Sequence, residues 1–164
     1  MAVASSGTAK VTLPADDQIL ITREFDAPKH LVYKAYTTPE LVRRWWSGHR
    51  GSVTSADIDL RVGGRWRYVM ITNGGLEVAF HGEYRELVPD QRLVTTEVYE
   101  GVPGGDDDPA VNFVTFMDVG GRTKLEVLVQ CPSKDVRDMI IGSGMEGGMQ
   151  ESMDKLEQVA ISLG

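Results

Sequence analysis

Residues 51–130 alternate between apolar and polar side chains, and short turn-forming pairs interrupt the alternation repeatedly. A period of two is typical of strands with one buried face. The interruptions are Gly63-Gly64, Asn73-Gly74, Pro89-Asp90 and Gly120-Gly121, and such pairs favour tight turns between antiparallel strands. The pattern predicts strands at 52–60, 65–72, 76–87, 92–99, 111–119 and 122–130. This antiparallel meander constrains the fold more than any other feature.

Helix signals lie on both sides of the meander. A strand at 18–25, with Ile19 and Ile21 on one face, is followed by helix starts at Pro28 and at Thr38-Pro39. After the meander, Pro132-Ser133 begins a helix that we expect to continue to about residue 163. Gly142, Gly144, Gly147 and Gly148 weaken its first half. They predict either a break or kink near Gly142 to Gly148, or a close approach of a ligand or the sheet to the helix backbone.

The order of these elements predicts an α+β fold. About seven antiparallel strands curve around the long C-terminal helix, and two short helices follow the first strand. A single helix with a diameter of about 10–12 Å is too thin to fill the concave side of such a sheet. We therefore expect an apolar cavity between sheet and helix. Residues 18–164 are expected to form one domain, preceded by a flexible tail at 1–17.

Composition excludes several classes of protein. Lys and Arg total 17 against 24 for Asp and Glu, a formal net charge of −7, which argues against nucleic-acid binding. No apolar segment reaches the length needed to cross a bilayer, and no secretory signal is recognisable. Cys131 is the single cysteine, so no intramolecular disulfide can form. We expect a cytoplasmic protein with no metal and no cofactor.

The candidate ligand-binding residues are aromatic, Met and Thr side chains on the predicted helices and on one face of the strands. They are Trp45, Trp46, Trp66, Tyr68, Met70, Phe80, Tyr84, Phe113, Thr115, Met117, Met145, Met149 and Met153. So much aromatic surface is rare on a solvated sheet face, and Met side chains suit an adaptable apolar site. Ordinary core packing explains the strand residues equally well. For the tryptophan pair and the Met stripe, core packing is the commoner arrangement.

Polar groups give weaker signals. His81 and Glu83 share the strand face opposite to the aromatic one, where solvated pairs are the ordinary case. Arg61, Arg65, Arg67, Arg85 and Glu97 are interpreted as such cross-strand pairs. The loop at 101–109 contains three consecutive Asp residues, which lack the alternating spacing of a calcium loop. It is interpreted as a solvated loop that could act as a lid.

Four segments resemble one protein family. They are "APKHLVYKAYTTPELVRRWW", "DLRVGGRWRYVM", "FHGEYRELVPDQRLV" and "GMEGGMQESMDKLEQVA". Together they span nearly all of the chain from about residue 18. The chain is similar to homologues of the C-terminal domain of the activator of heat-shock-protein-90 ATPase. That family lies within the superfamily of START domains, birch-pollen-allergen-like proteins and polyketide cyclases, and the resemblance implies a helix-grip fold.

Three functions are compatible with these patterns. The first is binding of a small apolar or amphipathic ligand, such as a lipid, polyketide or aromatic metabolite, in the cavity. The second, implied by the resemblance, is a co-chaperone-like interaction module with a chaperone as partner. The third is a cyclase or hydrolase that uses Tyr68, Tyr84, His81 and Glu83. We rank ligand binding first and enzymatic activity last.

Overall fold

The structure, a computed structural model, describes residues 9–100 and 107–164. Eight strands form the sheet: β1 (Lys10–Thr12), β2 (Gln18–Phe25), β3 (Gly51–Ile58), β4 (Arg65–Thr72), β5 (Glu77–Val88), β6 (Arg92–Tyr99), β7 (Ala110–Val119) and β8 (Arg122–Gln130). The helices are α1 (Lys29–Thr37), α2 (Pro39–Trp45), α3 (Lys134–Gly142) and α4 (Met145–Ser162). The predicted meander and both short helices are confirmed within one or two residues at most ends.

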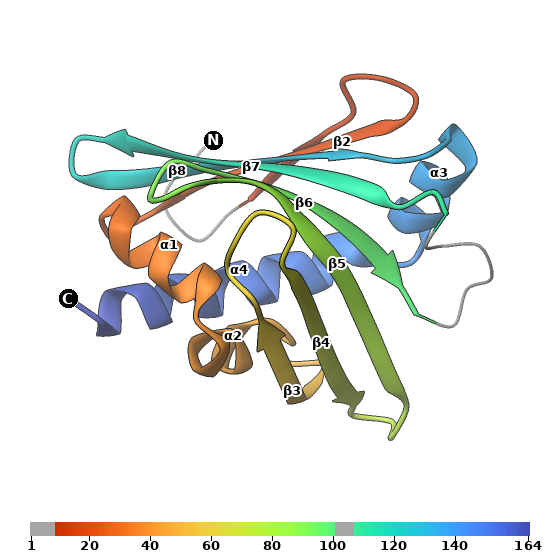
Figure 1. Cartoon of the computed structure of the whole chain (residues 1–164), viewed down its shortest axis with the longest axis horizontal. Helices are drawn as coiled ribbons and strands as arrows, with labels where there is room; N and C mark the ends of the chain where they lie inside the picture. The colour runs from red at the N-terminus through yellow and green to blue at the C-terminus, as the bar shows by residue number, and fades with distance from the viewer. Residues whose placement is uncertain (1–8, 101–106) are drawn as a thin grey trace.

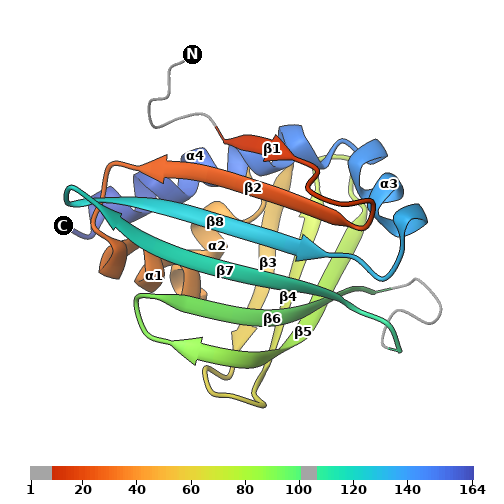
Figure 2. The same cartoon turned by 90° about the horizontal axis from the view of Figure 1, so that it is seen from above.

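The sheet is antiparallel throughout, with the order β1-β2-β8-β7-β6-β5-β4-β3. It curves, so that β3, β4 and β5 run steeply to the direction of β2 and β8 (Figure 1). Helix α4 lies along the concave side, and α1 and α2 cover one end of it (Figures 1 and 2). This is the helix-grip fold that the resemblance implies.

Two expectations about the ends of the chain need correction. Residues 10–12 are not part of a flexible tail, because they form β1 and pair antiparallel with β2, which makes eight strands rather than about seven. Residues 1–8 lie outside the described part of the chain. The C-terminal helix is two helices, separated at Ser143 and Gly144. Gly144 has a φ of +82°, a conformation that glycine adopts without steric cost. The break or kink predicted near the glycines is therefore a break.

Packing along α4 is uneven. In its C-terminal half, Leu156 and Ala160 are fully buried and Met153 and Val159 are nearly so. They join the core that contains Phe25, Val32 and Leu125. In its N-terminal half, Met145 and Met149 remain only partly buried. The C-terminal half of α4 therefore stabilises the fold, whereas the N-terminal half leaves apolar surface accessible.

Arg23 fastens the well-packed half of α4 to the sheet. It shares the concave face of β2 with Ile21 and Phe25, and its side chain has no accessible surface. Its Nη1 donates to Asp154 Oδ1 at 2.7 Å and its Nη2 to Glu157 Oε1 at 3.0 Å. The guanidinium also lies 5.0 Å from the centre of the Phe25 ring. A buried cation is compatible with folding here because two carboxylates of one helix neutralise it.

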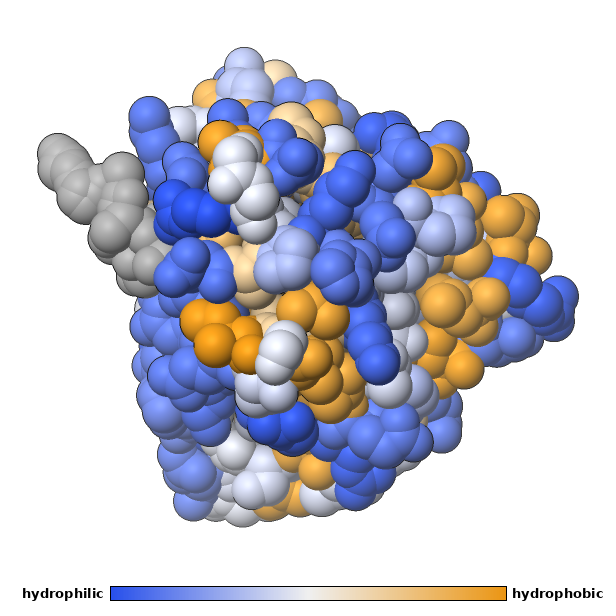
Figure 3. Space-filling model, turned by 90° about the vertical axis from the view of Figure 1, so that its left-hand side faces the viewer, coloured by the Kyte–Doolittle hydropathy of each residue, from blue (hydrophilic) through white to orange (hydrophobic). Residues whose placement is uncertain are grey.

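The end of the molecule formed by α1 and the C-terminus of α4 has a mixed surface (Figure 3). Apolar side chains reach it in patches between polar ones. Val119, the last residue of β7, and Ile161, near the end of α4, are both exposed. Scattered apolar groups of this kind are normal on protein surfaces. Within the described residues, no helix combines the length and the hydropathy that a membrane span requires.

Candidate ligand-binding site between the sheet and α4

The aromatic residues of β4 and β5 lie together on the concave face. Tyr68 is directly opposite Phe80, and Trp66 is opposite Gly82. Met70 follows on the same face of β4, opposite Val78, and Tyr84 continues the same face of β5. The sequence pattern had predicted that these residues share one face, and the register of the two strands confirms it.

Trp46 extends this surface from the helical side. Its ring lies 5.4 Å from the centres of both Tyr68 and Phe80, in edge-to-face arrangements. The ring centroids of Trp66 and Tyr68 are 4.7 Å apart. We call the four residues Trp46, Trp66, Tyr68 and Phe80 the aromatic cluster. Trp46 and Phe80 are only partly buried, whereas Trp66 and Tyr68 are buried. Edge-to-face packing holds the rings in place, and the two outer rings keep accessible surface.

The other tryptophan of the pair has a different environment. Trp45 is buried, packs 5.4 Å from the ring of Tyr36, and donates its Nε1–H to the carbonyl of Ala35 at 2.9 Å. It closes the core between α1 and α2. The two adjacent tryptophans thus point in different directions, as residues about 100° apart on a helix must.

Gly82 allows Trp66 to lie across β5. The indole Nε1–H of Trp66 donates to the carbonyl of Thr96 on β6 at 3.2 Å, so the ring passes over the glycine. A Cβ at position 82 would collide with that carbonyl oxygen and would lie 2.6 Å from the indole nitrogen. A side chain at this position is incompatible with the observed place of Trp66.

Glu97 is a polar group on the concave face that the sequence analysis placed wrongly. It lies between Thr95 and Tyr99 on one face of β6, and these two residues pair with Tyr84 and Phe80. Its Oε1 accepts a hydrogen bond from the Asn112 side-chain amide at 2.8 Å. Burial raises the pKa of the Glu97 carboxyl, and the Asn112 bond opposes that rise. Glu97 is therefore not one of the solvated cross-strand pairs.

Tyrosine hydroxyls accompany Glu97. The Tyr68 and Tyr84 side chains are hydrogen-bonded to each other. Burial is the main cause that raises the pKa of Tyr36, Tyr68 and Tyr84, and the negative charge of Glu97 adds to the rise for Tyr36 and Tyr68. All three phenols therefore stay protonated at neutral pH, and the Tyr68–Tyr84 bond uses the hydrogen of one of them.

The prediction that Phe113, Thr115 and Met117 extend this surface is wrong. On β7, the residues on the concave face are Asn112, Val114 and Phe116, which pair with Val129, Val127 and Leu125. The predicted set alternates with these residues and lies on the convex face. There Phe113 and Thr115 line a surface depression of about 440 Å³, and the Arg92 guanidinium lies 5.7 Å from the centre of the Phe113 ring.

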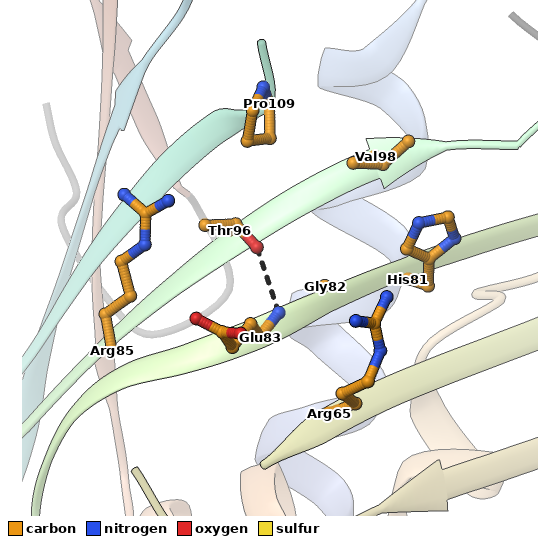
Figure 4. A pocket seen from close by; sticks show the side chains of 8 residues that line it. All are labelled: Arg65, His81, Gly82, Glu83, Arg85, Thr96, Val98 and Pro109. Atoms are coloured by element: carbon orange, nitrogen blue, oxygen red, sulfur yellow. Dashed lines mark hydrogen bonds between the residues drawn. The ribbon is translucent and has the colours of Figure 1, made fainter. Parts of the chain in front are cut away.

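His81 and Glu83 lie on the convex face as well, which separates the four residues considered for catalysis. They line a pocket of about 490 Å³ with Arg65, Gly82, Arg85, Thr96, Val98 and Pro109 (Figure 4). His81 Nδ1 lies 2.8 Å from Glu100 Oε2, and Glu100 also accepts two bonds from Arg67. These bonds lower the pKa of Glu100 to about 2. Tyr68 and Tyr84 are on the opposite side of the sheet, so the four residues form no single catalytic site.

The glycines of α4 contact an arginine rather than the sheet. A Cβ on Gly147 would lie 2.6 Å from Arg50 Nη2, and one on Gly148 would lie 3.6 Å from Arg50 Nε. Arg50 also lies 3.7 Å from Glu151. In the same region, Ser152 donates its hydroxyl to the carbonyl of Trp46 at 2.8 Å. These contacts hold the segment that carries Trp46 against α4.

The acidic loop is only partly described. Residues 101–106 lie outside the described part of the chain, and Asp107 and Asp108 are exposed. Among residues 9–100 and 107–164, no cluster of His, Cys, Asp and Glu side chains could hold a metal ion.

Comparison with known proteins identifies the fold and the family. Three crystal structures share the fold, and the one from Rhodobacter sphaeroides has a TM-score of 0.86 and 22% identity, with 96% of this chain and 100% of the other covered. The structure from Nitrosomonas europaea has a TM-score of 0.82 and 21% identity, with 92% of this chain and 98% of the other covered. The structure from Mycobacterium smegmatis has a TM-score of 0.82 and 22% identity, with 93% of this chain and 96% of the other covered. No curated protein matches the sequence. The profile of the family described as "Activator of Hsp90 ATPase homolog 1-like protein" matches residues 26–160. The chain therefore belongs to the activator of Hsp90 ATPase homolog 1-like family, as its sequence segments predicted.

Proposed function

We propose that the protein binds a small apolar or amphipathic molecule between the aromatic cluster and the N-terminal half of α4. The observation that carries the proposal is the partial burial of Trp46, Phe80, Met145 and Met149. These side chains are large and apolar and lie near the core, yet they keep accessible surface. A ligand that covers this surface gains roughly 25 cal/mol for each Å² of apolar area removed from water.

The flexibility of methionine favours a ligand of variable shape. Met145 and Met149 are one helical turn apart on α4 and their unbranched side chains adopt many rotamers. The tyrosine hydroxyls of Tyr68 and Tyr84 supply polar contacts at the deeper end. A mostly apolar surface with a few polar groups is typical of small-molecule sites.

The uncharged fluorophore N-phenyl-1-naphthylamine tests the proposal. Its emission rises in apolar surroundings, and we expect saturable micromolar binding to the wild-type protein. Met149→Trp puts a larger side chain at a partly buried position of α4, so we expect affinity at least tenfold lower in a fluorescence titration. A panel of fatty acids, flavonoids and sterols, screened by native mass spectrometry, extends the test to natural ligand classes.

Ile161→Trp is the matched control. Ile161 lies on the same helix but is half exposed at its C-terminal end. The same substitution there should leave the titration unchanged. Absence of any saturable binding, or equal loss in both variants, would contradict the proposal.

A chaperone partner is a second proposal, favoured by the family to which the chain belongs. It predicts that the purified protein recovers an Hsp90-type chaperone from extract of its native cell. Recovery unaffected by Met149→Trp would place that interaction outside the ligand site, and no recovery would count against the partner role.

A further inference from the structure

The Glu97 carboxylate has no cationic partner in the described part of the chain. It accepts a hydrogen bond from the Asn112 amide at 2.8 Å, and it takes part in no ion pair with the described Lys, Arg or His residues. The buried arginine of the concave face, Arg23, is already neutralised by Asp154 and Glu157. Arg137 on α3 bonds to Asp138 and to the Ala15 carbonyl. No described side chain is therefore left to neutralise Glu97.

A desolvated carboxylate without a counter-charge is unfavourable. Proteins satisfy such groups by pairing them with a cation, by protonating them or by coordinating a metal. No metal-binding cluster exists among the described residues. Glu97 as a whole residue is nevertheless only partly buried. A ligand can therefore bring a positively charged group to it from outside the protein.

The surroundings of Glu97 favour an organic cation over an inorganic one. Tyr84 and Phe80 are the β5 neighbours of Thr95 and Tyr99, the residues on either side of Glu97 on its strand face. Aromatic rings attract a desolvated ammonium through their negative faces. The formal net charge of −7 also attracts cations to the protein surface. An apolar body would contact the aromatic cluster and the methionines while its charged end pairs with Glu97.

We propose that the ligand is an amphipathic organic cation, an apolar or aromatic body with a protonated amine or amidine that binds the Glu97 carboxylate. This inference rests on the proposed function and names its substrate class. Asn112 positions the carboxylate by donating to Oε1, which leaves Oε2 for the ligand. Because the phenols of Tyr68 and Tyr84 are hydrogen-bonded to each other, one hydroxyl hydrogen of the pair remains for a ligand acceptor.

A pair of isosteric ligands tests the charge requirement directly. 1-Naphthylmethylamine is protonated at pH 7, and 1-naphthylmethanol has nearly the same shape without the charge. Each is titrated by isothermal calorimetry and by displacement of N-phenyl-1-naphthylamine. We expect the amine to bind the wild-type protein at least tenfold more tightly than the alcohol. Equal affinity of the two compounds would overturn this inference and leave the proposed function intact.

Glu97→Gln removes the charge and keeps an oxygen that can accept from Asn112. The preference for the amine should fall to less than twofold, while the alcohol binds as before. Glu83→Gln is the matched control, because Glu83 lies on the convex face of the same sheet. It should keep the full preference. A preference that survives in Glu97→Gln would also overturn the inference, and failure of every probe to bind would overturn the proposed function with it.

Thermal unfolding gives a second measurement that needs no ligand. Burial raises the folded-state pKa of Glu97 above its unfolded value, so stability falls as pH rises through these two values. The titratable groups near Glu97 are Tyr36 on α1, Tyr68 on β4 and Cys131 after β8. All three are neutral in this pH range. Glu97→Gln should therefore raise Tm by a few degrees at pH 7.5 and leave it unchanged near pH 3.5. An unchanged or lower Tm at pH 7.5 would mean that the carboxylate is already neutralised within the protein.

Discussion

Replacing Arg23 with alanine is expected to lower the free energy of unfolding by about 3–5 kcal/mol, a large part of the stability of a domain of this size. The guanidinium is inaccessible to solvent and forms the two short bonds to Asp154 and Glu157. Its removal leaves two carboxylates facing each other on α4 beside an apolar strand face. Glu157 suffers most, because its side chain is only 14% exposed. Urea unfolding followed by circular dichroism measures the effect.

Arg122→Ala is the control for this prediction. Arg122 also bridges carboxylates, with Glu24 at 3.0 Å and Asp26 at 3.6 Å, but its side chain is 36% exposed. Solvent screens such a pair, so we expect a loss below about 1 kcal/mol. If the two alanine variants lose similar stability, the Arg23 bonds do not hold α4 to the sheet in the way described.

Replacing Gly82 with valine is expected to cost about 2–4 kcal/mol and to displace Trp66. The new Cβ would collide with the backbone carbonyl of Thr96, which cannot move without disturbing β6. Overpacking of this kind costs about 1–3 kcal/mol, and loss of the Trp66 hydrogen bond adds about 1 kcal/mol. Because Trp66 packs on Tyr68, probe affinity should fall together with stability.

Gly142→Ala distinguishes a local collision from a general effect of replacing glycine. Gly142 ends α3 and a Cβ there would meet nothing within 4 Å. Alanine is the better helix former, so stability should stay the same or rise by up to about 1 kcal/mol. Unchanged tryptophan emission in Gly82→Val would contradict the proposed displacement of Trp66.

The strand boundaries could be predicted because turn chemistry is local. Asn73-Gly74 and Gly120-Gly121 mark hairpins through their own backbone preferences, and the structure has turns at both places. The same reasoning identified the shared face of Trp66, Tyr68 and Met70. On β7 it failed, since both faces of that strand carry an aromatic residue, Phe113 on one and Phe116 on the other. Alternation alone gives no reason to choose between them.

The places of the two charged residues on the concave face, Arg23 and Glu97, could not be predicted from local sequence patterns. Arg23 occupies a place in the apolar alternation of β2, and its two carboxylates follow 131 and 134 residues later. In the sequence, Glu97 is not distinguishable from an ordinary surface residue, because charged residues are frequent around it. The pairing of β6 with β5 places it beside aromatic residues. A charged residue at a position that the alternation assigns to the buried face was the signal available in both cases.

Because α4 is packed unevenly, the fold constrains the side chains of its two halves to different degrees. Leu156 and Ala160 cannot change without disturbing the whole molecule, whereas Met145 and Met149 are less constrained. A sequence can therefore exchange one set of side chains repeatedly while the backbone keeps its course. Proteins with only 21–22% identity to this chain share its fold, so most side chains can change while the scaffold is retained.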